Sequence, residues 1–160
     1  MAEAKFDVES FLKNAVATLR ANINTQISAI DTEKGDFVLD PIPSDAWFLN
    51  LIPKRFSRDV FVIYGIIEEA TDEVIETSVL RKITLQFEIG LNDKNWNESE
   101  AAVYRLLRYR RALEETVSLN FRKFGNGKKV KVEGLTPASV SFKGTRFEFS
   151  GINISIHLDS

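Results

Sequence analysis

The sequence has no cysteine and one histidine, His157, near its end. Without cysteine there are no disulfides, thiolate zinc sites or cysteine nucleophiles, which fits a reducing compartment. A single histidine in this place excludes a catalytic triad and a metal site of several histidines. No nucleophile can be paired with a base, so we expect no enzymatic activity and no cofactor or metal.

Long apolar runs and a strong excess of one charge are also missing. The first thirty residues hold no uninterrupted apolar stretch, so we expect neither a secretory signal nor a membrane span there. The formal net charge is -2, which gives no global reason to expect nucleic acid. A chain of 160 residues can bury its own core, and we expect residues 1–160 to form a single domain.

The clearest pattern present is a strand that ends at Leu91. Apolar and polar residues alternate over its last nine positions, which predicts one buried face. The stretch from Val60 to Ile67 is apolar at both odd and even positions, which predicts a strand covered on both faces. A turn at Thr71–Glu73 would join the two into a long antiparallel hairpin.

Amphipathic helices are predicted on both sides of this hairpin. Apolar residues recur at three- and four-residue steps from about Val8 to Ile30 and from about Glu98 to Phe121. Asn97 with Glu100 resembles a capping box at the start of the second helix. The second helix has an expected apolar seam: Val103, Leu106, Leu107, Leu113, Val117 and Phe121.

The C-terminal section has the pattern of strands. We expect short strands at Lys129–Glu133 and Ala138–Phe142, and a last strand at Thr145–Leu158. In the last strand the apolar residues change from odd to even positions, which predicts a bulge at Ser150–Gly151. The expected fold class is therefore α+β: an antiparallel β-sheet with a long central hairpin, covered by the two amphipathic helices.

A long irregular connection occupies about residues 32–58 and could include a short strand at Phe37–Leu39. Neither period holds there, and Pro41 and Pro43 are spaced to prevent a helix. Loops of this length are uncommon in compact domains unless they have a function. Three apolar residues within it are candidates for a site: Trp47, Phe48 and Leu51. They either fold back onto the core or form a contact surface for another subunit.

Charge is divided unevenly along the chain. Residues 59–93 hold eight acids against two bases, whereas residues 97–131 hold nine bases against four acids. The acidic candidates lie in the hairpin: Glu68, Glu69, Asp72 and Glu73. The basic candidates lie in the second helix and the loop after it: Arg105, Arg108, Arg111, Lys128 and Lys129. The acids lack the spacing of a calcium loop. The bases fit a solvated face, an acidic partner surface, or a nucleic-acid-binding module over residues 105–131.

The order of elements resembles the tail-terminator proteins of long-tailed, siphovirus-like bacteriophages. The likeness covers nearly the whole chain: an N-terminal helix and a long loop, then DVFVIYGII with VLRKITLQFEIGL, then NESEAAVYRLLRYRRALEETV, then TRFEFSGINISIHL. Head-completion and other neck proteins of the same viruses have similar sizes and are an alternative. A nucleic-acid-binding module that uses the basic segment is the second alternative.

The resemblance implies a structural protein of the virion, assembled in the host cytoplasm. It implies a hexameric ring that caps the tail tube, stops its polymerisation and joins it to the head connector. DNA would pass through the channel without specific binding, and no membrane or catalysis would be involved. The hairpin acids and the helix bases would meet across subunits, the Trp47 loop would dock on a neighbour or the tube, and the loop from Gly125 to Lys131 would face a ring partner or the lumen.

Overall fold

The computed structural model describes seven regular elements and the segments next to them. The described residues are 7–50, 59–74, 77–92, 99–120, 122, 124, 129–142 and 144–157. The elements, in chain order, are α1 (Val8–Lys34), β1 (Trp47–Leu49), β2 (Val60–Val74), β3 (Thr77–Asn92), α2 (Ser99–Leu119), β4 (Lys129–Phe142) and β5 (Thr145–His157). Side chains within residues 72–81, 99–100 and 142 are outside this description.

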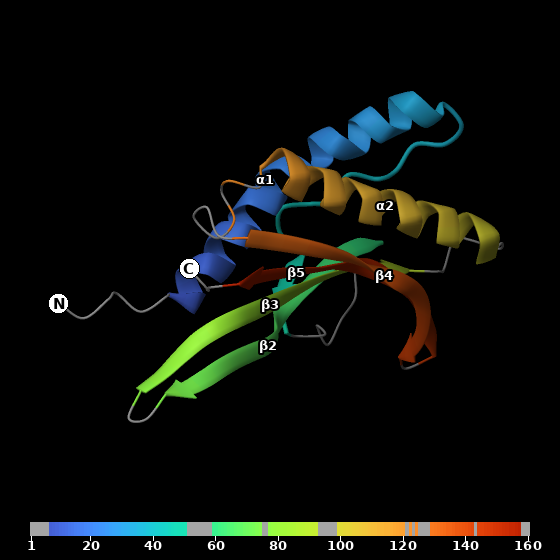
Figure 1. Ribbon diagram of the computed structural model, residues 1–160. Coiled ribbons are helices and arrows are strands. Elements are labelled where there is room, and N and C mark those ends of the chain that lie inside the picture. Colours follow the sequence, from blue (N-terminus) through green and yellow to red (C-terminus); the bar gives the residue numbers. More distant parts are fainter. Residues whose placement is uncertain are drawn as a thin grey trace.

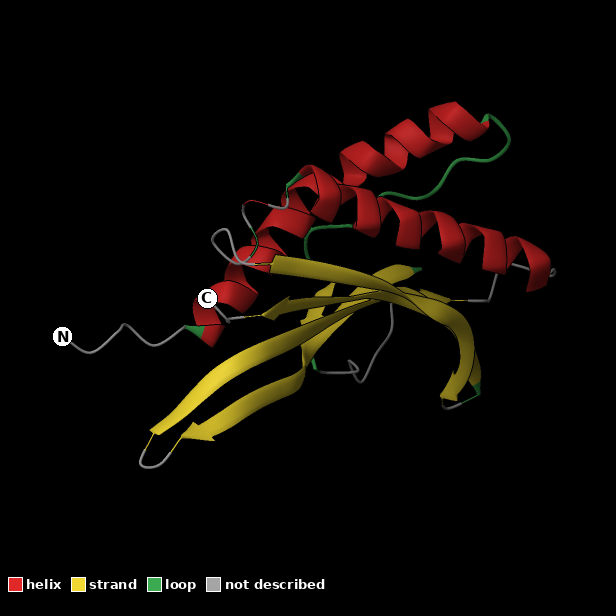
Figure 2. Ribbon diagram, viewed as in Figure 1, coloured by secondary structure: helices red, strands yellow, loops and turns green. Residues whose placement is uncertain are grey.

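The strands form one five-stranded sheet in the order β1-β2-β3-β5-β4, and both helices lie on the same side of it (Figures 1 and 2). α2 packs on β5 and β4, and α1 packs on α2. The α+β class with two covering helices is confirmed. The sheet is mixed instead of wholly antiparallel, because β1 runs parallel to β2. A strand of three residues is too short for its alternation to be recognised in a sequence.

Local sequence signals set the bounds of α1. The Asp7 side chain accepts a hydrogen bond from the Ser10 amide at 3.1 Å and caps the first turn. Gly35, with φ +68°, ends the helix, and its amide donates to the Asp31 carbonyl at 3.0 Å. The helix therefore runs one turn past the expected end at Ile30. Seven residues of its apolar stripe are buried, as expected: Phe11, Ala15, Val16, Leu19, Ile23, Ile27 and Ile30. Leu12, also expected in the stripe, is half-buried, and Phe6 lies outside the described residues.

The buried side of α2 is rotated from the expected seam. Leu106, Leu113 and Val117 are buried as predicted, but Val103 is exposed. Tyr109 is buried in addition, and its hydroxyl donates to the Asp40 carbonyl at 2.7 Å. Contact with the segment after α1 thus decides which residues face inward. The proposed cap at Asn97 and the seam position Phe121 lie outside the described residues.

The central hairpin is longer than predicted. The backbone of Thr71–Glu73, expected to turn, is paired with β3, and the ladder continues to Val74 opposite Thr77. Two register shifts interrupt it, after Ile66 and after Ala70. The alternation of β3 is confirmed, since five residues of one parity are buried: Ile83, Leu85, Phe87, Ile89 and Leu91.

The irregularity predicted in the last strand lies in its neighbour. β5 pairs with β3 without a shift, so the bulge expected at Ser150–Gly151 is wrong. The shift falls between Leu135 and Ala138 of β4, which is one continuous strand instead of two. Phe147 and Phe149 consequently face away from the helices, and each packs edge-on against Phe61 with centroids 5.8 Å apart.

Candidate interaction surfaces

Trp47, expected either in the core or in a contact surface, lies in the core. It is 7% exposed on β1, and the Arg20 guanidinium of α1 lies 5.8 Å from its ring centroid. Its indole N–H has no hydrogen-bond partner among the residues described. Phe48 is half-buried, and Leu51 lies outside the described part of the chain. The geometry supports the fold-back interpretation for Trp47 and leaves it little surface for a partner.

The arginines of α2 bind the end of α1 and the segment that follows it. Arg108 makes a bidentate pair with Asp36, with nitrogen-to-oxygen distances of 2.7 and 2.8 Å. Its guanidinium lies 3.9 Å from the centroid of the Phe37 ring, and its side chain is only 12% exposed. Arg105 also stacks on Phe37, at 4.6 Å. The strand expected at Phe37–Leu39 is therefore an extended segment held against α2.

Arg111 completes this contact one turn further along α2. It pairs with Glu33 of α1 and, at 2.8 Å, with Glu115 on its own helix. These carboxylates raise the pKa of the Arg111 guanidinium. Arg110 donates to the Leu135 carbonyl of β4 at 3.1 Å. As predicted, pairing within the helix does not by itself account for these arginines. Their additional partners, however, lie in other elements of the same chain. This weakens the nucleic-acid interpretation and the pairing of Arg108 and Arg111 with another subunit.

The Arg108–Asp36 pair predicts a response to acid. The guanidinium and the amide of Phe37 hold the pKa of Asp36 well below its usual value of 3.8. A depressed carboxyl pKa contributes stability at neutral pH that is lost as the pH falls below about 4. Asp36→Asn is therefore expected to lower the melting temperature at pH 7. At pH 3 the difference in melting temperature between the variant and the native protein should be smaller. Thermal unfolding at both pH values measures this.

Asp59→Asn is the matched control for this experiment, because Asp59 is an exposed carboxylate just before β2. It should change the melting temperature little at either pH. If Asp36→Asn were as stable as the native protein at pH 7, the ion pair would not hold the segment after α1 to α2.

The acidic hairpin extends beyond the body of the molecule (Figure 1). Glu68 and Glu69 are exposed, and Ile67 beside them is 50% exposed. Glu68 pairs with Lys82 across the hairpin at 3.4 Å. The backbone of Asp72 and Glu73 forms part of β2, but their side chains lie outside the part of the structure that is described. The exposed acids remain candidates for contact with another molecule.

Beyond the body, the hairpin is a ribbon of two strands. Within the described residues, β1 pairs with Val62–Tyr64 of β2, and the pairing of β5 with β3 reaches Lys82, opposite His157, the last described residue of β5. In the described sheet, residues 67–74 and 77–81 therefore have only each other as strand neighbours. Both edges of the ribbon present backbone groups to the surroundings.

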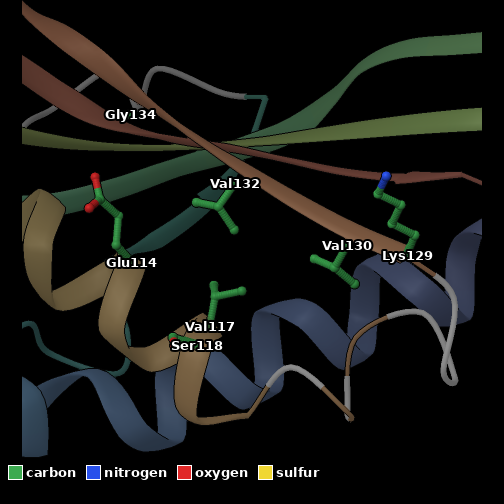
Figure 3. A pocket seen from close by; sticks show the side chains of 7 residues that line it. All are labelled: Glu114, Val117, Ser118, Lys129, Val130, Val132 and Gly134. Atoms are coloured by element: carbon green, nitrogen blue, oxygen red, sulfur yellow. The ribbon is translucent and has the colours of Figure 1, made fainter.

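A groove runs between α2 and β4 (Figure 3). Its volume is about 510 Å³, and it is lined by Glu114, Val117, Ser118, Lys129, Val130, Val132 and Gly134. Val130 and Val132 point toward α2, and Lys129 lies at the first position of β4. Lys128 and the rest of the loop before it are outside the described residues. Val117 was expected in the apolar seam of the second helix, but Val130 and Val132 were not singled out, because the order of strands is not visible in a sequence.

Among the described residues, no three potential metal ligands from His, Cys, Asp and Glu gather in one place. Neither described helix is long and apolar enough to cross a membrane. Comparison with protein-family models gave no match, and comparison with curated proteins found no relative.

Proposed function

We propose that this protein is a tail terminator of a long-tailed bacteriophage, a structural protein of the virion. It forms a ring, a hexamer, that caps the tail tube, stops its polymerisation and joins it to the head connector. The order of elements supports this proposal: a helix, a long connection, a long hairpin, a helix and a C-terminal pair of strands. The same order underlies the resemblance in the sequence.

The observation that carries the proposal is the projecting hairpin. Two-stranded hairpins in isolation are marginally stable in water, and three strands or a packed face are needed for independent stability. Residues 67–74 and 77–81 have no third strand within the described sheet. A second copy, or a neighbouring ring, can provide the missing contact. Such a dependence on neighbours is expected of a protein that functions only when assembled.

The ends of the sheet support a ring over a closed dimer. In the described sheet, β4 is the last strand on one side, whereas on the other side β1 covers only Val62–Tyr64 of β2. Contact between unlike surfaces of identical chains is heterologous, and it produces a ring when the rotation closes. DNA would then pass through the central channel without specific binding. The tail tube and the head connector are the partners that this role requires.

Shortening the hairpin is expected to abolish ring formation without unfolding the body. Replacing residues 70–82 by Asn-Gly would place a two-residue turn between Glu69 and Ile83, which are paired in the native ladder. The native protein should give annular particles by negative-stain imaging and a hexamer by native mass spectrometry. The shortened chain should keep its circular dichroism spectrum and be monomeric.

Lys13→Ala is the control, since Lys13 is exposed on α1 and pairs locally with Glu9, one turn away on the same helix. It should leave the rings intact. A native protein that is monomeric by light scattering at micromolar concentration and low salt would overturn the proposal. Rings that bind head connectors but never the open end of tail tubes would instead indicate a head-completion protein.

A further inference from the structure

The β4 strand presents an open edge at its beginning. Residues 129–133 pair with β5 on one side only, and β4 is the last strand of the described sheet. Further along β4, the edge is not available for pairing with another strand. The Leu135 carbonyl accepts hydrogen bonds from Arg110 and from Ser150, and the register shift and Pro137 follow. About five residues, the length of a typical strand, remain available for pairing.

The groove beside this edge has room for an added strand. A strand that pairs with β4 would lie about 4.8 Å from it and next to α2. Side chains alternate along such a strand, so every second one would enter the groove above Val117, Val130 and Val132. The edge would supply backbone hydrogen bonds, and the groove would select the side chains.

The lysines of β4 restrict which strand can be added. Lys129 and Lys131 alternate with the two valines and so lie on the other face of the sheet. Lys131 pairs with Glu133, two residues further along the strand, at 3.0 Å, and both side chains are largely exposed. Lysines on an edge oppose pairing with a second identical edge. A strand with acidic side chains would instead be attracted to these lysines and pair with the edge.

We propose that the β4 edge of one copy pairs with the free β2 edge of the next copy. In the described sheet the β2 edge has no strand beside it after Tyr64, and residues 66–74 carry four acids: Glu68, Glu69, Asp72 and Glu73. The two edges lie at opposite ends of the same sheet and have opposite charge. The inference rests on the proposed ring, and it names the contact that joins the subunits. One sheet would then continue from subunit to subunit.

Charge reversal with rescue tests the pairing. Lys129→Glu with Lys131→Glu should raise the protein concentration at half-assembly by about tenfold, because the acidic β2 edge would repel the reversed charges. Glu69→Lys with Asp72→Lys should do the same; Glu68 is left unchanged because it pairs with Lys82. All four changes in one chain should restore assembly to within about threefold of the native protein. Native mass spectrometry over a dilution series measures each variant.

Lys13→Glu with Lys34→Glu is the control, since it makes the same change in net charge on exposed positions of α1. It should leave assembly unchanged. If the quadruple variant assembles no better than the double variants, the two edges do not meet, and the inference fails.

Hydrogen exchange separates strand addition from contact between side chains alone. In assembled rings, amides of residues 129–133 that face away from β5 should exchange at least about tenfold more slowly than in the Lys129→Glu, Lys131→Glu monomer. Rings with equal exchange at these amides would overturn the inference but leave the proposed function standing. A native protein that forms no rings would overturn both.

Discussion

Gly151→Ala is expected to lower the free energy of unfolding by about 3 kcal/mol or more. A Cβ at this position of β5 would lie 1.9 Å from the carbonyl oxygen of Phe87 and 2.8 Å from the Cα of Glu88. Both atoms belong to the backbone of β3, so no side-chain rotation relieves the overlap. The two central strands would have to separate, and valine should prevent folding altogether.

Gly35→Asn provides the contrast for this prediction. Gly35 has a φ of +68°, and a Cβ added there would meet no atom within 4 Å, so only the backbone conformation restricts substitution. Asparagine tolerates this conformation, and a loss below about 1 kcal/mol is expected. Urea denaturation at one fixed protein concentration compares the variants, because assembly itself stabilises the fold. A Gly151→Ala protein within about 1 kcal/mol of the native protein would show that β3 and β5 can shift apart.

Phe87→Ala should cost about 3–5 kcal/mol, a large part of the roughly 5–15 kcal/mol that stabilises a typical domain. Phe87 is 0% exposed on the central strand β3, and its ring stacks on Tyr64 of β2 with centroids 5.9 Å apart. It belongs to the single core that joins the sheet to both helices. Removing the ring would leave a cavity between the sheet and the helices. Other contacts hold these layers in place, so we expect the surrounding side chains to fill little of the cavity.

The melting temperature should fall by roughly 6–20 °C for such a loss in a chain of this size. Leu119→Ala is the control, since Leu119 ends α2 and is 68% exposed. Its change should stay within about 0.5 kcal/mol. Equal melting temperatures for Phe87→Ala and Leu119→Ala would contradict the assignment of Phe87 to the core.

The positions of the charged groups shift the proposed assembly contacts from α2 to the sheet. Arg108 and Arg111 hold the end of α1, so their reversal would disturb the fold as well as any interface. Trp47 lies in the core of the described part of the chain. The projecting hairpin and the edge of β4 are the parts of the described sheet that lack a further strand neighbour. These are the surfaces on which assembly is expected to depend.

The sequence by itself determined the features that depend on near neighbours. The 3.6-residue period of α1 and the alternation of β3 both arise within a few residues of chain, and both agree with the structure. The caps of α1 at Asp7 and Gly35 are equally local. The division into an acidic hairpin and a basic helix was visible in the same way.

Only the tertiary structure decided how distant segments meet. The parallel pairing of β1 with β2, the partners of Arg108 and the open edge of β4 join residues that are far apart in the chain or depend on the order of strands. The bulge predicted in β5 was wrong for the same reason, because the packing of Phe147 and Phe149 on Phe61 replaces it. Periodicity says which face of a strand is apolar, but the packing of layers decides what covers that face.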